Sequence, residues 1–262
     1  VFEPPHAGPE TRTVFYFPGC GSERLHAGIS MAALHVLLAT GTRVILPPPF
    51  LCCGFPARVN ARTEQHGRTQ LHDTILFAQI REMFSHLTFD GCVVTCGTCR
   101  EGLAEMEAGR VFGGRIVDVA AYAAERGLKP PAGGDGEALY HAPCHDSLEG
   151  KAQKVLDGLG GFGQVHAVPH CCSEAGTLAL SRPDITDAML HRKREALAEA
   201  KHETPATTIL TNCPSCIQGL GRNAPLGYAP KHIAVALAER LSGPRWEERF
   251  EAEAARAELI RF

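Results

Sequence analysis

The chain has 262 residues, of which 44% are hydrophobic and 21% are charged, and its formal net charge is −3. This length and composition are typical of a globular protein with one large hydrophobic core or two smaller ones. The slightly negative charge without a Lys/Arg stripe argues against a nucleic-acid partner, and the lack of a long apolar run argues against direct membrane insertion.

The chain opens with a segment rich in proline and glycine, so residues 1–10 are predicted to form a linker. It begins with Val1 instead of Met, which is typical of a mature chain or an excised fragment. The N-terminus lacks a basic segment followed by an apolar one, so the sequence predicts no secretion signal. We therefore expect a cytoplasmic protein, in which thiols stay reduced.

Residues 11–129 are predicted to form a first lobe in which strands alternate with helices. Apolar runs and helical periodicity place strands at 13–17, 43–46 and 91–95, and helices at 23–40, at 63–86 and from residue 100 onward. Its cysteines follow the three strands: Cys20, then the pair Cys52-Cys53 with Gly54, then Cys96-x-x-Cys99.

A second lobe is predicted at 138–243, after a Pro/Gly-rich linker at 130–137. Its strands are expected at 138–141, 165–168 and 207–211, and its helices at 147–158, 183–202 and 231–241. Its cysteines again follow the strands: Cys144, then the pair Cys171-Cys172, then Cys213-x-x-Cys216. The charged, Ala-rich residues 244–262 predict a C-terminal helix or tail.

The same pattern of five thiols thus occurs twice, with equivalent cysteines 117 to 124 residues apart. Alternating strands and helices predict an α/β fold of two pseudo-symmetric, Rossmann-like lobes with parallel sheets. The carboxyl ends of parallel strands share one edge of a sheet, which is where binding sites form. We therefore expect the three cysteine loops of each lobe to converge on one point.

Clustered reduced thiols indicate a metal site or a redox centre, because disulfide frameworks belong mostly to small secreted chains. Thiolates select zinc, Cu(I) or iron–sulfur clusters. A helix that starts at each Cys-x-x-Cys lowers the thiol pKa and favours the anion. Zinc and a cubic 4Fe–4S cluster each take four ligands, so five thiols leave one spare in either case.

The order and spacing of the ten thiols resemble the cysteine-rich CCG domain over about residues 13–241. This domain occurs in tandem in the cysteine-rich subunit of heterodisulfide reductases. It also occurs in the iron–sulfur subunits of glycolate, lactate and glycerol-3-phosphate dehydrogenases. Long fused proteins that carry an FAD-linked oxidase and ferredoxin domains end in the same domain, and the resemblance implies that this chain is such a C-terminal part.

The resemblance implies a noncubane 4Fe–4S cluster for each complete set of five cysteines, and so one or two clusters in all. The implied ligands are Cys20, Cys52, Cys53, Cys96 and Cys99 in the first lobe, and Cys144, Cys171, Cys172, Cys213 and Cys216 in the second.

The function implied is electron transfer in a flavin-dependent oxidoreductase of the 2-hydroxyacid dehydrogenase type. FAD and ferredoxin-type clusters would sit on another domain or subunit, which would also hold the protein peripherally at the inner membrane. The chain alone is then expected to be inactive.

Two other functions fit the same thiols. A disulfide reductase of the heterodisulfide type would use the same ligands with a substrate pocket against the cluster. A structural or docking domain would instead hold zinc with four of the five thiols of a lobe.

Four further residues near the thiols carry separate expectations. Cys92 lies inside an apolar strand and is expected to belong to the core. His145 and His170 adjoin cysteines, and either a ligand or proton-carrying role or a hydrogen bond to backbone would explain them. Ser173 follows the second Cys-Cys pair where the first has Gly54, so this loop is expected to be less free to adopt positive φ.

Overall fold

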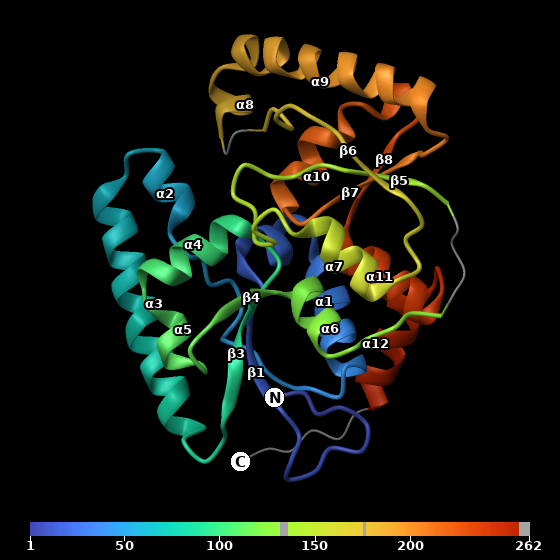
Figure 1. Cartoon of the computed structure of the whole chain (residues 1–262). Helices are drawn as coiled ribbons and strands as arrows, with labels where there is room; N and C mark the ends of the chain where they lie inside the picture. The colour runs from blue at the N-terminus through green and yellow to red at the C-terminus, as the bar shows by residue number, and fades with distance from the viewer. Residues whose placement is uncertain (132–135, 175–176, 257–262) are drawn as a thin grey trace.

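A computed structural model describes residues 1–131, 136–174 and 177–256 of the chain. These residues form two four-stranded sheets, one in each half, and every strand pair within them is parallel. Helices connect the strands in both halves (Figure 1). The prediction of an α/β fold with two pseudo-symmetric, Rossmann-like lobes is confirmed.

The first sheet has the strand order β2-β1-β3-β4. Its strands are β1 (Thr13–Phe17), β2 (Arg43–Ile45), β3 (Phe89–Val94) and β4 (Ile116–Asp118). Its helices are the π-helical turn η1 (Gly21–Leu25), α1 (Ala27–Ala39), α2 (Phe55–Val59), α3 (Thr63–Met83), α4 (Gly97–Glu105), α5 (Ala108–Val111) and α6 (Val119–Glu125). All five residues of β1 are buried, as expected of a central parallel strand covered on both faces.

The second sheet repeats this arrangement with the order β6-β5-β7-β8. Its strands are β5 (Ala138–Tyr140), β6 (Val165–Ala167), β7 (Thr208–Thr211) and β8 (Ala229–His232). Its helices are α7 (Ala152–Leu159), α8 (Leu178–Ser181), α9 (Pro183–Glu203), α10 (Pro214–Gly221), the 3₁₀ turn η2 (Ala224–Leu226), α11 (Ile233–Ser242) and α12 (Trp246–Arg256).

The two lobes share a hydrophobic core. Helix α1 packs against α11, and α6 packs against α7, so that these four helices lie between the two sheets (Figure 1). One cluster of buried side chains contains Leu37 of α1 together with Leu237 of α11. The long helices α3 and α9 lie on the outer sides. The lobes are therefore fixed to one another by apolar packing as well as by the chain that joins them.

Each sheet contains a fourth strand that the sequence analysis did not predict. β4 has only three residues and β8 contains Pro230, so neither shows the apolar run that is typical of a buried strand. Both lie at a sheet edge, where proline is tolerated. The predicted start of the helix at 231–241 was therefore wrong, because α11 begins at Ile233, after β8.

Two other helix starts also differ from the prediction. The helix predicted at 23–40 is interrupted at His26, whose φ is −138°, and the regular helix α1 begins at Ala27. The helix predicted at 147–158 begins at Ala152, because the Asp146 carboxylate accepts hydrogen bonds from the backbone N–H groups of Leu148 and Gly150 and holds a turn there.

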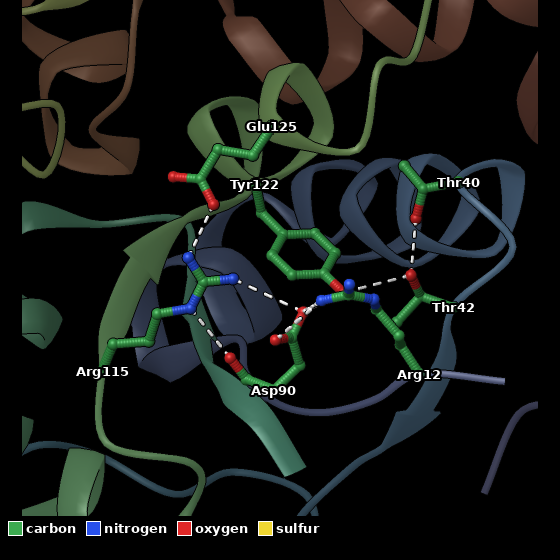
Figure 2. Close-up of polar contacts among 7 residues, drawn as sticks. All are labelled: Arg12, Thr40, Thr42, Asp90, Arg115, Tyr122 and Glu125. Atoms are coloured by element: carbon green, nitrogen blue, oxygen red, sulfur yellow. Dashed lines mark hydrogen bonds and ion pairs between the residues drawn. The ribbon is translucent and has the colours of Figure 1, made fainter. Parts of the chain in front are cut away.

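Asp90 ties the amino-terminal edge of the first sheet together (Figure 2). Its carboxylate accepts hydrogen bonds from Arg12 at 3.2 Å, from the Tyr122 hydroxyl at 3.1 Å and from Arg115 at 3.4 Å. Arg115 also donates its Nε–H to the Asp90 carbonyl at 2.8 Å. These partners come from the start of β1, the start of β4 and from α6, so one carboxylate joins three segments.

We expect Asp90→Ala to lower the free energy of unfolding by about 1–3 kcal/mol, because two guanidinium groups and a hydroxyl lose their common acceptor. Equilibrium urea unfolding followed by circular dichroism measures this change. The control is Glu64→Ala, which breaks only a solvent-exposed pair with Arg68 and should have a much smaller effect. Equal effects of the two substitutions would contradict the prediction.

Candidate metal centres between the two lobes

The structure places ten of the eleven cysteines in the loops and first helical turns that follow the carboxyl ends of the strands. All eleven carry free thiols. Cys96 is the N-cap residue of α4 and Cys213 that of α10, so each Cys-x-x-Cys spans a strand-to-helix turn as the sequence predicts. Cys92 lies apart from them inside β3, where its side chain is fully buried and burial raises its pKa.

The five thiols of the first lobe form a continuous chain of contacts. This first-lobe thiol group consists of the thiols of Cys20, Cys52, Cys53, Cys96 and Cys99. The sulfur atoms of Cys20 and Cys52 are 3.5 Å apart. Cys53 interacts with Cys52 on one side and with Cys99 on the other, and Cys99 interacts with Cys96. The three loops of the first lobe therefore do converge on one point.

The second lobe repeats this chain of contacts, with a longer sulfur–sulfur distance at one end. Its members, here called the second-lobe thiol group, are the thiols of Cys144, Cys171, Cys172, Cys213 and Cys216. The sulfur atoms of Cys144 and Cys171 are 3.9 Å apart, and Cys144 is exposed. Cys172 interacts with both Cys171 and Cys216, and Cys216 interacts with Cys213.

The two thiol groups meet where the lobes pack together. The thiols of Cys96 and Cys213 lie close enough across the interface for each to shift the pKa of the other. Around this point the backbones approach closely, since a Cβ atom added to Gly97 would lie 1.7 Å from the His145 carbonyl oxygen. The pseudo-symmetric approach brings Pro214 to 3.1 Å from a Cβ atom added to Gly21. The sequence predicts two separate sites, whereas the structure places them next to one another.

Hydrogen bonding among the thiols divides them into acidic and weakly acidic members. Bonds to Cys20 and Cys53 lower the pKa of Cys52 to about 3. Bonds to Cys171 and Cys216 likewise lower the pKa of Cys172. The same bonds raise the pKa of Cys20 and of Cys216. Each group therefore shares its protons among several sulfur atoms, and a soft cation that replaces those protons gains the whole set as ligands.

Two helical glycines hold the Cys-Cys loops against the Cys-x-x-Cys turns. A Cβ atom added to Gly102 would lie 2.8 Å from the Cβ atom of Cys53, and one added to Gly219 would lie 2.3 Å from the carbonyl oxygen of Cys172. Both glycines follow the second cysteine of a Cys-x-x-Cys motif by three residues. The sequence analysis missed them, although the repeated spacing Cys-x-x-Cys-x-x-Gly was a usable signal.

Ser173 adopts the backbone conformation that the sequence analysis considered difficult for it. Its φ is 70°, close to the 81° of Gly54 after the first Cys-Cys pair. Its backbone N–H points at the Cys171 sulfur at 3.4 Å, and the residue is fully buried. The left-handed conformation costs a non-glycine residue about 1–2 kcal/mol, so the second loop has the geometry of the first at some strain.

The two candidate histidines lie beside the second-lobe thiol group but differ in their contacts. The Nδ1 atom of His145 is 2.8 Å from Glu101, and its ring contacts Phe55, both in the first lobe. His170 is exposed and has a φ of 69°, and its carbonyl oxygen accepts a hydrogen bond from Lys193. The sequence analysis missed His141, which lies within 4.8 Å of the sulfur atoms of both Cys172 and Cys216.

The outer helices carry a buried ionisable residue at the same position in each lobe. Asp73 is the eleventh residue of α3 and Lys193 the eleventh of α9, and their exposed fractions are 1% and 0%. Burial lowers the pKa of Lys193 to about 8, although the thiolate of Cys172 opposes this shift. Burial raises the pKa of Asp73, and the thiolate of Cys52 adds to the increase.

A buried polar layer supports the residues that directly precede each Cys-x-x-Cys motif. The hydroxyl groups of Tyr16 and Thr95 are 3.5 Å apart in the first lobe, and Tyr140 donates to Asn212 at 2.8 Å in the second. His232 crosses between the lobes, because its Nε2 atom lies 2.9 Å from the Thr95 carbonyl oxygen. This layer fixes the turns from which Cys96 and Cys213 project.

His232 predicts a loss of stability at acidic pH. Burial lowers the pKa of this imidazole from 6.5 to about 4, so the unfolded chain takes up a proton that the folded protein refuses. The contribution of neutral His232 to the free energy of unfolding is fully present above pH 6.5 and is lost as the pH falls to about 4. We expect the difference in unfolding free energy between the protein and His232→Asn to change by about 2–3 kcal/mol across this window.

Urea unfolding of both proteins at several pH values between 7 and 4 measures this difference. Asparagine keeps a helix-capping side chain without a titrating group. The comparison with the variant is needed because Asp118, whose pKa burial raises to about 6, contributes with the opposite sign: its stabilisation is lost as the pH rises. A difference that stays constant with pH would contradict the prediction.

The sheets and thiol groups define a duplicated α/β protein with one cysteine-rich site in each lobe. A sequence model of the cysteine-rich domain named CCG matches residues 14–104 and again residues 138–221. The chain therefore belongs to the CCG cysteine-rich domain family and carries two copies of the domain.

Several proteins are similar to the chain. An uncharacterized iron–sulfur protein of Methanococcus maripaludis is 27% identical over 79% of this chain and 40% of its own length. Lactate utilization protein A of an Exiguobacterium species is 26% identical over 86% of this chain and 97% of its own length. The glycolate oxidase iron–sulfur subunit of Escherichia coli is 26% identical over 81% of this chain and 55% of its own length. The chain thus spans less than half of the methanogen protein.

Among solved structures, a glutamate racemase isoform of Bacillus anthracis is 14% identical, with a TM-score of 0.37 over 96% of this chain and 85% of the racemase. A likeness this low carries no argument about function. None of the helices in the described part of the chain has the length and apolarity that a bilayer span requires.

Proposed function

We propose that the chain is an iron–sulfur electron-transfer module in which each thiol group holds one centre. The observation that carries this proposal is the convergence of five thiols in each lobe, with Cys96 of one set near Cys213 of the other. Four similar proteins are named as iron–sulfur proteins or subunits, which supports the same assignment.

The donor sets fit iron–sulfur chemistry. Soft thiolates are the ligands that such clusters take, and each set is largely buried, with Cys53, Cys99, Cys172 and Cys216 inside the protein. The adjacent Cys-Cys pairs contribute both thiols to their groups, so five thiols are available where a cubic cluster would use four. We therefore infer a noncubane 4Fe–4S centre in each lobe, with Cys20, Cys52, Cys53, Cys96 and Cys99 as one ligand set and Cys144, Cys171, Cys172, Cys213 and Cys216 as the other.

An iron–sulfur centre, when bound, takes up and releases single electrons. The residues of this chain would shield it from water, fix its sulfur ligands and connect the two lobes. Cys96 and Cys213 are the members of the two ligand sets that lie near one another across the interface. Cys144, Cys20 and Cys52 lie at the solvent side of the sets, where a partner can approach. The arrangement therefore suits relay of electrons through the protein from one outer side to the other.

The electron donor and acceptor are proposed to be flavin-containing and ferredoxin-type domains or subunits. Lactate utilization protein A and the glycolate oxidase iron–sulfur subunit point to oxidation of small 2-hydroxy acids as the process served. Neither a Gly-rich dinucleotide fingerprint after a strand nor a ferredoxin cysteine run occurs in the sequence. The chain by itself should therefore not oxidise lactate or glycolate.

Metal analysis of protein prepared without oxygen tests the proposal. The expected result is about four iron atoms and four acid-labile sulfides for each filled site, and no turnover of lactate or glycolate by the isolated chain. One zinc per lobe without labile sulfide would instead support a structural or docking domain and overturn the proposal. Robust oxidation of lactate by the chain alone would overturn the module assignment.

The exposure of Cys144 favours disulfide reduction as a second candidate function. Its sulfur lies at the open end of the second-lobe thiol group, 3.9 Å from the Cys171 sulfur, where a disulfide substrate could approach. Reduction of a mixed disulfide by the loaded protein with a reduced dye would support this candidate. Absence of such reduction in a protein whose centres accept electrons from the dye would leave electron relay as the function.

A further inference from the structure

The two thiol groups differ in the side chain that lies three residues before their first cysteine. The first lobe has Phe17 at this position and the second has His141. Phe17 ends β1, and His141 directly follows β5, the corresponding central strand. The sites are therefore alike in their thiols and unlike in one neighbouring ring.

His141 is placed to interact with the sulfur atoms of the second lobe. It is 1% exposed, and one of its ring nitrogens lies within 4.8 Å of the sulfur atoms of Cys172 and Cys216. Its Nδ1 atom lies 3.1 Å from the Nζ atom of Lys193. Its Nε2 atom has no hydrogen-bond partner among the described residues, so it is the nitrogen available to the thiols.

Lys193 determines which nitrogen of His141 carries the proton. The three N–H donors of the ammonium group are shared among four acceptors, which are His141 Nδ1 and the carbonyl oxygens of Val168, Pro169 and His170 at 3.2, 2.7 and 3.2 Å. An ammonium group has only donors, so Nδ1 must be the acceptor and the neutral ring carries its hydrogen on Nε2. His141 is therefore oriented to donate an N–H···S hydrogen bond, not to bind a metal through a lone pair.

The first lobe has the opposite environment at both positions. Phe17 offers no donor to the thiols. The residue of α3 that corresponds to Lys193 is Asp73, an acidic group whose carboxylate is 2.9 Å from the His72 ring. The second-lobe thiol group thus has a buried ammonium group and an N–H donor at these two positions, whereas the first has a carboxyl group and an apolar ring. The polar neighbours of the first-lobe thiols lie elsewhere: Arg24 faces Cys52, and the Thr98 hydroxyl is 2.9 Å from the Cys96 sulfur.

Resting on the function proposed above, we propose that the second-lobe centre has the higher reduction potential, so that electrons pass from the first lobe to the second. Hydrogen bonds to the sulfur atoms and a nearby positive charge both stabilise the reduced, more negative form of a cluster. His141 acts through the sulfur atoms and is a positioning residue. In each transfer one electron leaves the first-lobe centre and enters the second-lobe centre, and no bond is made or broken.

The test is a redox titration of the loaded protein followed by electron paramagnetic resonance. Two midpoint potentials are expected, and the centre with the higher potential should show a nitrogen coupling in protein labelled with ¹⁵N-histidine. His141→Phe, which copies the first lobe, should remove this coupling and lower that potential alone. The expected loss is at least tenfold in the equilibrium constant for electron transfer between the centres, which is about 59 mV for one electron.

Two further variants make the result specific. His191→Phe makes the same chemical change at an exposed position of α9 and should leave both potentials and the coupling unchanged. His141→Gln keeps an N–H donor and should have a reduction potential closer to that of the unmodified protein than His141→Phe has. This variant keeps the test valid if His141→Phe loosens the fold. Equal potentials in the unmodified protein, or no response to His141→Phe, would overturn this inference alone. Absence of iron and sulfide would overturn the proposed function and this inference together.

Discussion

Replacing Cys53 by serine is expected to abolish the visible absorbance of the first-lobe centre and to remove about four iron atoms per protein. Cys53 lies in the middle of the chain of contacts, between Cys52 and Cys99, and is 2% exposed. A serine hydroxyl keeps the size of the side chain but not the soft thiolate that iron–sulfur clusters require. Absorption spectra and iron content of protein prepared without oxygen measure the loss.

Cys92→Ala is the matched control for this substitution. Cys92 is also buried and belongs to the same lobe, but it lies inside β3 and outside the first-lobe thiol group. Its removal should leave absorbance and iron content unchanged and should cost only about 1 kcal/mol for the small cavity. If both variants lose iron to the same extent, the ligand assignment in the first lobe is wrong.

Gly97→Ala is expected to lower the free energy of unfolding by about 3 kcal/mol or more and to disturb both centres. The new Cβ atom would lie 1.7 Å from the carbonyl oxygen of His145, which is backbone and cannot rotate away. Relief of this clash requires the lobes to separate where Cys96 and Cys213 meet. Urea unfolding and iron content of the same preparations measure the two effects.

Gly158→Ala provides the comparison for Gly97→Ala. Gly158 lies in α7, and a Cβ atom there would meet only the Ala124 Cβ atom, at an ordinary distance of 3.7 Å. Alanine is favoured over glycine within a helix, so this variant should gain up to about 1 kcal/mol of stability. A Gly97→Ala protein as stable as the unmodified one would show that the lobes do not pack as described.

The central strands β1, β3, β5 and β7 were predictable because they are largely buried, and the edge strands β2 and β6 were predictable from the short apolar runs that precede the Cys-Cys loops. The run Thr13–Phe17 is continuously apolar apart from its first residue, and the structure has β1 with the same bounds. The edge strands β4 and β8 escaped prediction, because a short or proline-containing strand at an edge needs little apolar sequence. Two edge strands were thus predicted and two were missed, so position at an edge alone did not decide whether a strand could be predicted.

Some of the site residues that the sequence analysis missed could have been found from the sequence, and others could not. Gly102 and Gly219 repeat at a fixed distance from their Cys-x-x-Cys motifs, so the duplication could have revealed them. His141 and Lys193 are 52 residues apart in the chain and meet only because α9 packs over the loop that follows β5. No spacing rule links such a pair.

The amino-acid sequence by itself determined the duplication, the alternation of strands and helices, and the gathering of thiols within each lobe, since periodic burial and the shared edge of parallel strands follow from local pattern. Only the tertiary structure decided that the two thiol groups lie next to one another and that the residues at positions 73 and 193 beside them differ in charge. Those properties depend on which helix faces pack between the lobes and on which buried side chains they bring together. Such contacts between distant segments are fixed by the complementarity of packed surfaces, which spacing along a chain does not encode.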